Sequence, residues 1–188
     1  MAFFFENHPK ISYDIQKNGI THTVQNPLVR FKLQNILKNR TALYYTHDIN
    51  EGQTIEFIAD RYYGDSTLDW IIYIVNDIID PQYDLPMDYQ QFIAYVKSKY
   101  GSTEFPLNTT HHYEHIIQTQ SVLFDGTIVP EKVIVVDETT YNTLTATERR
   151  EVSNYTYEER LNESKRTIKV LHTDYLGQFL DEAERIFE

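Results

Sequence analysis

The chain has 188 residues and carries 17 basic against 28 acidic side chains, so its formal net charge is −11. This length suits one sizeable domain or a compact core with a small appendage. The acidic balance argues against nucleic acid or anionic lipid as the main partner, because both attract basic surfaces. The sequence contains no cysteine, which excludes disulfides, thiolate nucleophiles and thiolate zinc sites.

Neither the N-terminal segment nor any later stretch predicts membrane targeting. Residues 1–6 form a short apolar run without a basic region, and no apolar run approaches the ~18 residues of a membrane span. We therefore expect a protein that is made in the cytoplasm. Tyr, Phe and Trp make up 14% of the residues, which favours a protein that works among partners, because aromatic side chains are enriched at interfaces.

The first half of the chain alternates between helical and strand-like patterns. Asn26-Pro27 is typical of a helix start, and apolar residues at helical spacing continue the predicted helix to about Asn39. The aromatic and β-branched residues 41–46 predict a strand, after which a turn follows. A second helix is predicted from Thr54 until Gly64 ends it.

The next helix is predicted over residues 67–76, after a capping-box pattern from Ser66 to Asp69. Its first apolar stripe consists of Leu68, Ile71, Ile72 and Val75, and its opposite face carries Trp70, Tyr73 and Ile74. A helix that is apolar all round is buried on both sides. We expect the second face to dock another subunit or the chain's own C-terminal segment, or else to pack internally.

The second half of the chain combines two helical regions with a different texture between them. Residues 88–100 predict a helix with a capping box from Asp88 to Gln91, and Gly101 is a natural C-cap. Residues 102–150 contain alternating segments and an Asp125-Gly126 turn, which predicts a small β-rich insert. The last predicted elements are a short helix from Thr156 to about Ser164, a strand over residues 167–171 and a helix from about Asp174.

The order of strand, helix, turn and helix over residues 42–86 resembles a LysM module, a βααβ unit that binds peptidoglycan or chitin. The residues that carry this resemblance are Tyr44-Tyr45, Gly52-Gln53-Thr54-Ile55, Ile58-Ala59, Leu68, Val75-Asn76 and Leu85-Pro86. The sequence departs from the sugar-binding pattern after Asn76, where Asp80-Pro81 replaces the usual glycine-containing lead into the second strand.

Nearly the whole chain also resembles a second family, the LysM-like baseplate wedge subunit of contractile-tailed bacteriophages. It begins with Phe3-Phe4-Phe5 and with residues 40–45. Its most specific residues are Tyr63-Gly64-Asp65, Leu68-Asp69-Trp70, and the run from Asn76-Asp77 to Asp80-Pro81. It continues through the helix of residues 89–100 and ends with residues 162–170 and 179–187.

This resemblance implies a structural protein of the virion, in the tail baseplate. Its partners would be other wedge subunits and neighbouring wedges of a sixfold baseplate, with the tail hub or sheath-initiating proteins as further candidates, and neither nucleic acid nor membrane. The residues that we expect to take part in protein contacts are Tyr44, Tyr45, Trp70, Tyr73, Ile74 and Tyr83. Tyr44 and Tyr45 alternate across their strand, so one should face the core and the other could face outward.

We accordingly expect an α+β fold with a LysM-like βααβ core. The predicted parts are an N-terminal arm and helix (1–40), the LysM-like module with its following helix (41–101), a β-rich insert (102–155) and a C-terminal helix, strand and helix (156–188).

Two polar clusters are candidate metal sites. His111 and His115 would share one face of a helix or strand, as zinc ligands can, but we favour a polar surface strand next to a loop, because no third ligand is evident. Asp77, Asp80 and Asp84 offer oxygen ligands, yet their spacing fits no calcium loop, and such residues commonly cap turns.

No catalytic motif stands out, so we expect neither enzymatic activity nor a cofactor. Two alternatives to the baseplate function stay open at this point. One is a LysM protein that binds peptidoglycan through the groove between its helix and strand ends. The other is a metal-dependent enzyme built on the cluster from His111 to His115.

Overall fold

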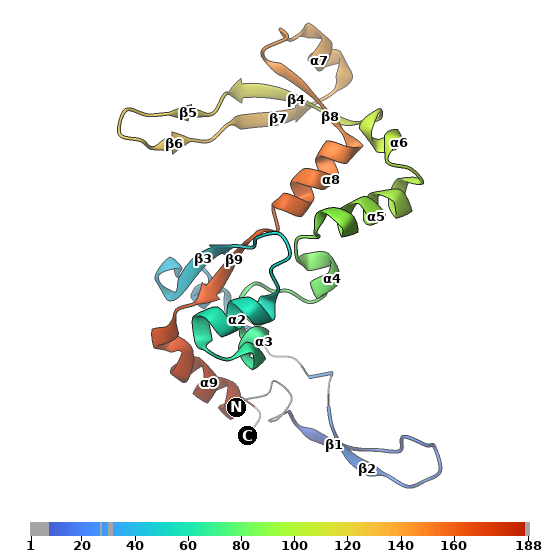
Figure 1. Cartoon of the computed structure of the whole chain (residues 1–188), viewed down its shortest axis with the longest axis vertical. Helices are drawn as coiled ribbons and strands as arrows, with labels where there is room; N and C mark the ends of the chain where they lie inside the picture. The colour runs from blue at the N-terminus through green and yellow to red at the C-terminus, as the bar shows by residue number, and fades with distance from the viewer. Residues whose placement is uncertain (1–7, 27, 30–31, 187–188) are drawn as a thin grey trace. The chain divides into compact units, whose positions relative to one another are not determined.

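The computed structural model describes residues 8–26, 28–29 and 32–186, and it has an α+β fold with several small antiparallel sheets (Figure 1). The chain forms two compact units. Unit 1 combines the described residues up to Pro86 with those from Lys165 onward, and unit 2 is Met87–Ser164. Unit 2 is therefore inserted into the sequence of unit 1.

The centre of unit 1 is built from two strands and two helices. Strand β3 (Tyr44–Asp48) precedes helices α2 (Ile55–Tyr63) and α3 (Asp69–Val75), and β9 (Thr167–Leu171) pairs antiparallel with β3. The register places Tyr44 opposite Leu171 and Asp48 opposite Thr167. The strand that closes this β-α-α-β arrangement thus comes from the C-terminal segment, after the whole of unit 2.

The segment at Leu85-Pro86, where the LysM resemblance placed the end of the module, does not form that strand. Helix α4 (Pro81–Asp84) occupies the turn-rich segment instead. The Asp80 side chain accepts a hydrogen bond from the Gln82 amide, so this aspartate with the following proline starts a helix rather than leading into a strand.

Two apolar clusters form the core of unit 1. The first contains Ile49, Ile55, Ile58, Ala59, Ile72, Ile168 and Val170. The second contains Leu68, Trp70, Ile71, Val75 and Leu171, and residues of the C-terminal helix α9 (Leu176–Arg185) pack against it. Both clusters include residues of β9, so the C-terminal strand is an integral part of the core.

Local chemistry sets the ends of the two core helices. The Thr54 hydroxyl accepts a hydrogen bond from the Phe57 amide, and Gly64 ends α2 in the left-handed region at φ 73°. The predicted helix from Thr54 to Gly64 is confirmed. A 3-10 turn, η2 (Ser66–Leu68), precedes α3, and its cap is Asp65 rather than Ser66.

The N-terminal part differs most from its prediction. Strands β1 (Lys10–Tyr13) and β2 (His22–Gln25) form an antiparallel hairpin that the sequence analysis missed. In the described part of the predicted helix 27–39, only α1 (Asn35–Lys38) is helical, and Pro27 lies outside the described residues, as do Phe3-Phe4-Phe5 and Phe187. Further 3-10 turns, η1 (Thr41–Leu43) and η3 (Thr173–Tyr175), precede β3 and α9.

Unit 2 begins with the predicted helix α5 (Tyr89–Tyr100), whose capping box and left-handed Gly101 are both confirmed. Its sheet has the order β7-β4-β8, formed by β4 (Thr110–Gln118), β7 (Lys132–Val136) and β8 (Arg149–Ser153). The remaining elements are α6 (Glu104–Leu107), β5 (Ser121–Val122), β6 (Ile128–Val129), α7 (Glu138–Thr143) and α8 (Asn154–Glu163). Helices α6 and α7 and strand β8 were not predicted from the sequence.

The boundaries of unit 2 differ from those drawn on the sequence, which placed the helices on either side of the insert in other parts. Helices α5 and α8 belong to the same compact unit as the sheet. The Phe92 ring meets the Tyr155 ring edge-on at 5.5 Å, and the two residues lie on these two helices. The insert therefore includes its flanking helices.

Two asparagine side chains form hydrogen bonds with backbone groups that are distant in the sequence. In unit 2, the Asn162 side chain accepts a hydrogen bond from the Met87 amide (2.8 Å) and donates one to the Met87 carbonyl (3.0 Å). In unit 1, the Asn76 side chain makes the same pair of bonds with the backbone of Lys169 in β9. The first contact joins the two ends of unit 2, and the second joins the end of α3 to the closing strand.

Candidate protein-interaction surfaces

Trp70 of α3 is covered by the chain's own C-terminal helix. Its side chain is only 8% exposed, and its ring lies 5.9 Å from the ring of Phe179 in α9. Leu176, Leu180 and Ala183 of α9 pack against the same cluster. Among the expectations for this face, the structure agrees with docking of the C-terminal segment.

Tyr73 and Ile74 extend this face in two directions. Tyr73 packs against the first core cluster and Ile74 against the second, and both side chains are half-buried. Burial raises the pKa of Tyr73 to about 12, and the nearby carboxylates of Glu56 and Asp69 act in the same direction. The tyrosine therefore stays a neutral phenol that is adapted to packing.

The remaining candidate tyrosines separate into one packed and two exposed residues. Tyr44 packs against the second core cluster, and its hydroxyl donates to the Leu37 carbonyl at 3.2 Å. Tyr45 faces the other side of β3 and stacks on His172 with ring centroids 4.4 Å apart. Tyr83 in α4 is half exposed. Tyr45 and Tyr83 thus keep accessible aromatic surface.

The three aspartates of the candidate calcium site have other roles. Asp77 is ion-paired with the buried Lys38 and lies 3.8 Å from Lys32. Asp80 caps α4, while the Asp84 carboxylate accepts hydrogen bonds from the amides of Ile79 and Asp80. Among the described residues, no group of three His, Asp or Glu side chains is placed to hold a metal ion.

A pocket of about 480 Å³ opens in unit 1 between the end of α3 and strand β9. It is lined by Lys38, Asn39, Val75, Asn76, Asp77 and Lys169. Most of these side chains are charged or amides, so the pocket suits a polar ligand better than an apolar one.

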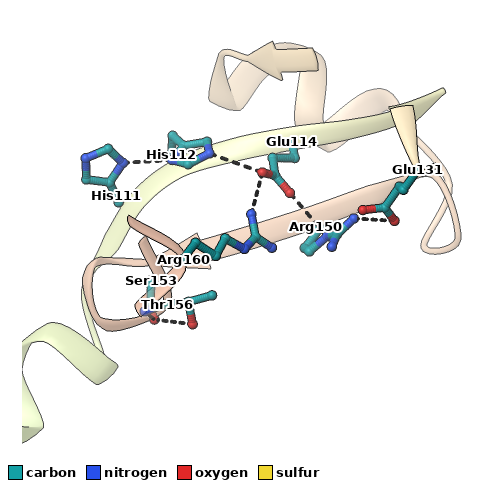
Figure 2. A network of polar contacts seen from close by, with 8 residues as sticks. All are labelled: His111, His112, Glu114, Glu131, Arg150, Ser153, Thr156 and Arg160. Atoms are coloured by element: carbon teal, nitrogen blue, oxygen red, sulfur yellow. Dashed lines mark hydrogen bonds and ion pairs between the residues drawn. The ribbon is translucent and has the colours of Figure 1, made fainter. Parts of the chain in front are cut away.

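Unit 2 contains an ionic network centred on the buried Glu114 of β4, which Figure 2 shows. One Glu114 oxygen accepts from Arg160 of α8 at 2.7 Å, and the other lies 3.2 Å from Nε of Arg150 in β8. His112 lies 3.4 Å from the first oxygen, and Arg150 also contacts Glu131 at 2.7 Å. A buried carboxylate requires such pairing, because its desolvation is otherwise costly. The network ties β4, β8, α8 and the residue before β7 together.

The histidine cluster belongs to the edge of this network. The His111 ring stacks on Tyr157 at 3.8 Å, and its Nδ1 lies 2.7 Å from Nδ1 of His112 (Figure 2). His112 faces Glu114 rather than His115. The alternative in which His111 and His115 bind zinc finds no third ligand among the residues that the structure describes.

A second buried carboxylate, Glu158 of α8, joins this helix to α5. It accepts hydrogen bonds from Lys99 (2.6 Å) and from the hydroxyls of Tyr100 (2.9 Å) and Tyr95 (3.2 Å). Burial raises the pKa of Glu158, but the hydrogen bonds from Lys99 and the tyrosines outweigh it, and the net pKa is lowered. The hydrogen bond to Glu158 in turn raises the pKa of Lys99.

An apolar ribbon formed by residues 117–135 extends from this braced sheet. Figure 1 shows β5 and β6 continuing the β4–β7 hairpin away from the rest of unit 2. The large apolar residues exposed along it are Ile117, Val122, Leu123, Phe124, Ile128, Ile134 and Val135. Exposed apolar patches of this kind mark interaction sites. The hairpin turn was predicted from the sequence, but this surface was not. Its sequence signal is that Asp125 is the only charged residue from Ile116 to Pro130.

Comparisons with protein-family models and with curated proteins find no match to this chain. In the described part of the chain, no helix has both the length and the apolar character needed to cross a membrane.

Proposed function

We propose that this chain is a structural subunit of the baseplate wedge of a contractile bacteriophage tail. In this function it joins other wedge subunits and neighbouring wedges, and it resides in the virion. The tail hub and sheath-initiating proteins are further candidate partners. The chain would act through protein contacts, without chemistry of its own.

The observation that carries this proposal is the apolar ribbon of unit 2. Seven large apolar side chains are exposed on residues 117–135, and the ion pairs of Glu114 link β4 to β8 and α8 in the sheet from which the ribbon extends. An isolated two-stranded hairpin is only marginally stable in water, so exposed apolar hairpins are stabilised by burial against a partner. This arrangement is expected of a protein that is stabilised further when its exposed apolar residues are buried in an assembly.

The β-α-α-β core supports the LysM-like part of the proposal. The residues most specific to the wedge resemblance have structural roles in this core: Gly64 ends α2, Asp65 caps the next turn, and Trp70 packs on α9. Asn76 holds the closing strand. If this core is LysM-like, its second strand is β9, which follows the inserted unit 2 in the sequence.

Quantitative peptide mass spectrometry on salt-washed, purified tailed particles tests this function. The amount of the chain is scaled to a known sixfold tail component. We expect a copy number that is a small multiple of six. Absence of the chain from washed particles would refute the baseplate function.

A second candidate function is peptidoglycan binding, which the polar pocket between α3 and β9 favours. Its amide and ammonium groups suit hydroxyl and carboxylate groups of a wall polymer. This function predicts that the purified chain sediments with insoluble cell wall and that Asn39→Ala weakens sedimentation. A chain that stays in the supernatant excludes this candidate.

A further inference from the structure

The pocket between α3 and β9 is positively charged, although the chain as a whole carries a net charge of −11. Two lysines, Lys38 and Lys169, line it, and Asp77 is the single carboxylate among the described lining residues. Lys32 also lies 3.8 Å from the Asp77 carboxylate. Three ammonium groups are therefore balanced by one carboxylate, which leaves an excess of two positive charges at this site.

Lys38 holds its ammonium group in the wall of this pocket. Its side chain is only 10% exposed and forms an ion pair with Asp77. A buried ammonium requires such a partner, because its desolvation is otherwise costly. An ammonium group has three N–H donors, and the ion pair with Asp77 uses one of them. Two donors of Lys38 thus remain for a ligand.

Lys169 contributes a second ammonium group, which forms no ion pair within the described part of the chain. It donates a hydrogen bond to the Lys38 carbonyl at 2.9 Å and lies 5.8 Å from the centroid of the Tyr44 ring. These contacts hold the side chain beside the pocket and leave further donors unused. The exposed side-chain amide of Asn39 adds another donor to the lining. The pocket is therefore rich in donors, which match the oxygens of an anion.

The backbone at the end of α3 places the Asp77 carboxylate at this site. Asp77 has φ 57°, in the left-handed region that glycine normally occupies at a helix end. The Ile78 amide donates to the Tyr73 carbonyl at 2.9 Å, as such a helix end requires. The ion pair with Lys38 offsets the backbone cost of an aspartate at this position. The carboxylate keeps the buried ammonium paired, while the charge of Lys169 stays uncompensated.

An oxyanion fits these groups better than a cation or a neutral sugar does. A cation would meet the excess positive charge, and a neutral sugar would cover Lys169 without compensating its charge. We propose that this pocket binds a compact, doubly negative oxyanion group, a phosphate or a pair of carboxylates, through Lys38, Lys169 and the Asn39 amide. This inference does not depend on the baseplate function. It concerns the same pocket as the wall-binding candidate and names the chemical group that the pocket recognises.

NMR titration of the full chain at low ionic strength tests this site. The ligands are inorganic phosphate and malonate, and the neutral sugar diacetylchitobiose and sodium chloride at matched ionic strength are the comparisons. The side-chain amide signals of Asn39 report on the pocket. The titrations are repeated with Lys169→Gln, Asp77→Asn and Lys10→Gln. Lys10 is an exposed lysine of β1 that does not line the pocket, so it controls for the lost charge.

We expect phosphate or malonate to shift the Asn39 signals to saturation, whereas chloride and the sugar leave them in place. Lys169→Gln should weaken the binding at least about fivefold, as for a hydrogen bond to a charged group, and Lys10→Gln should leave it unchanged. Asp77→Asn should strengthen the binding at least about twofold, because it removes the competing negative charge and asparagine also adopts the left-handed backbone. A purely structural role of these residues predicts no such gain.

Binding of either anion supports the site, and the stronger one identifies whether phosphate or carboxylate oxygens are preferred. The proposal is overturned if neither anion gives a saturable shift, if Lys10→Gln weakens binding as much as Lys169→Gln, or if the sugar shifts Asn39 equally. It is also overturned if a folded Asp77→Asn variant binds no more tightly than the wild type. If Asp77→Asn does not fold, the comparison of Lys169→Gln with Lys10→Gln decides.

This site and the wall-binding candidate fail in different ways. If the chain binds phosphate or malonate but stays in the supernatant with insoluble cell wall, the wall-binding candidate is excluded and the oxyanion site is retained. If the chain sediments with cell wall but binds neither anion, the oxyanion site is wrong and the wall-binding candidate is retained.

Discussion

Replacing Asn76 tests whether a single side chain holds the closing strand of unit 1. Its amide nitrogen donates to the carbonyls of Ile72 (2.9 Å) and Lys169 (2.7 Å), and its oxygen accepts from the Lys169 amide (2.8 Å). Asn76→Ala removes all three bonds. At a net value of about 1 kcal/mol per hydrogen bond, the free energy of unfolding should fall by about 2–4 kcal/mol.

Asn76→Asp separates the contributions of donor and acceptor. It keeps an acceptor for the Lys169 amide but sets a carboxylate against two carbonyl oxygens, which raises the pKa of the introduced group in the folded state. The folded state then binds the proton more tightly than the unfolded state. The carboxyl group is therefore least harmful below its unfolded pKa of about 4, and stability is lost as the pH rises through the folded-state pKa.

Urea unfolding followed by the fluorescence of Trp70, the only tryptophan of the chain, reports on unit 1 directly. We expect Asn76→Ala to be less stable than the wild type at all pH values. Asn76→Asp should be less stable than Asn76→Ala near neutral pH and should approach the stability of Asn76→Ala only in acid. The exposed Asn39 provides a matched control, since Asn39→Ala should change stability by less than about 0.5 kcal/mol. A loss of under 0.5 kcal/mol for Asn76→Ala, or an identical pH dependence of the two variants, would refute the role of this clamp.

Three further measurements test the rest of the fold. Trp70→Ala should lower the free energy of unfolding, followed by circular dichroism, by about 3–5 kcal/mol. A double-mutant cycle with Phe179→Ala should give a coupling energy of about 0.5–1.5 kcal/mol, and zero coupling would contradict the contact between the two rings. The pKa of Glu158 is lowered on folding, so its stabilisation is complete above its usual pKa of 4.5 and is lost as the pH falls through the folded-state value. Thermal melts should therefore show a steeper acid loss for wild type than for Glu158→Gln, and parallel curves would exclude this. The segment 87–164, expressed alone, should give a dispersed NMR spectrum, because its ends are already joined by hydrogen bonds; a random-coil spectrum would show that it depends on unit 1.

Local chemistry made part of this fold predictable. The helices that begin after Thr54 and Asp88 were predicted because their caps lie within a few residues of the turns that they start. The β3–β9 pairing was not predicted, because Asp48 and Thr167 are 119 residues apart and no local pattern records their contact. Strand β8 was missed because its arginines resemble a solvated segment, whereas Arg150 is paired with Glu114.

The candidate interaction residues show the same limit. Aromatic content and helical spacing identified Trp70, but sequence alone could not distinguish a subunit contact from the α9 contact that the structure contains. The ribbon around Phe124 carries a readable pattern, an uncharged alternating stretch with a turn at Asp125-Gly126. That pattern predicts a hairpin. The exposure of the apolar side chains on the hairpin depends on which strands pair, and the local sequence does not predict this pairing.

The insertion of unit 2 also determines when the core of unit 1 can be completed during translation. Strand β3 and helices α2 and α3 are synthesised long before β9, so the apolar residues that β9 covers stay open to other contacts during translation. When unit 2 folds, the Asn162–Met87 contact brings its two ends together and shortens the loop that the β3–β9 pairing must close. A substitution that slows the folding of unit 2 would thus also delay the completion of unit 1, even though the two units are separately compact.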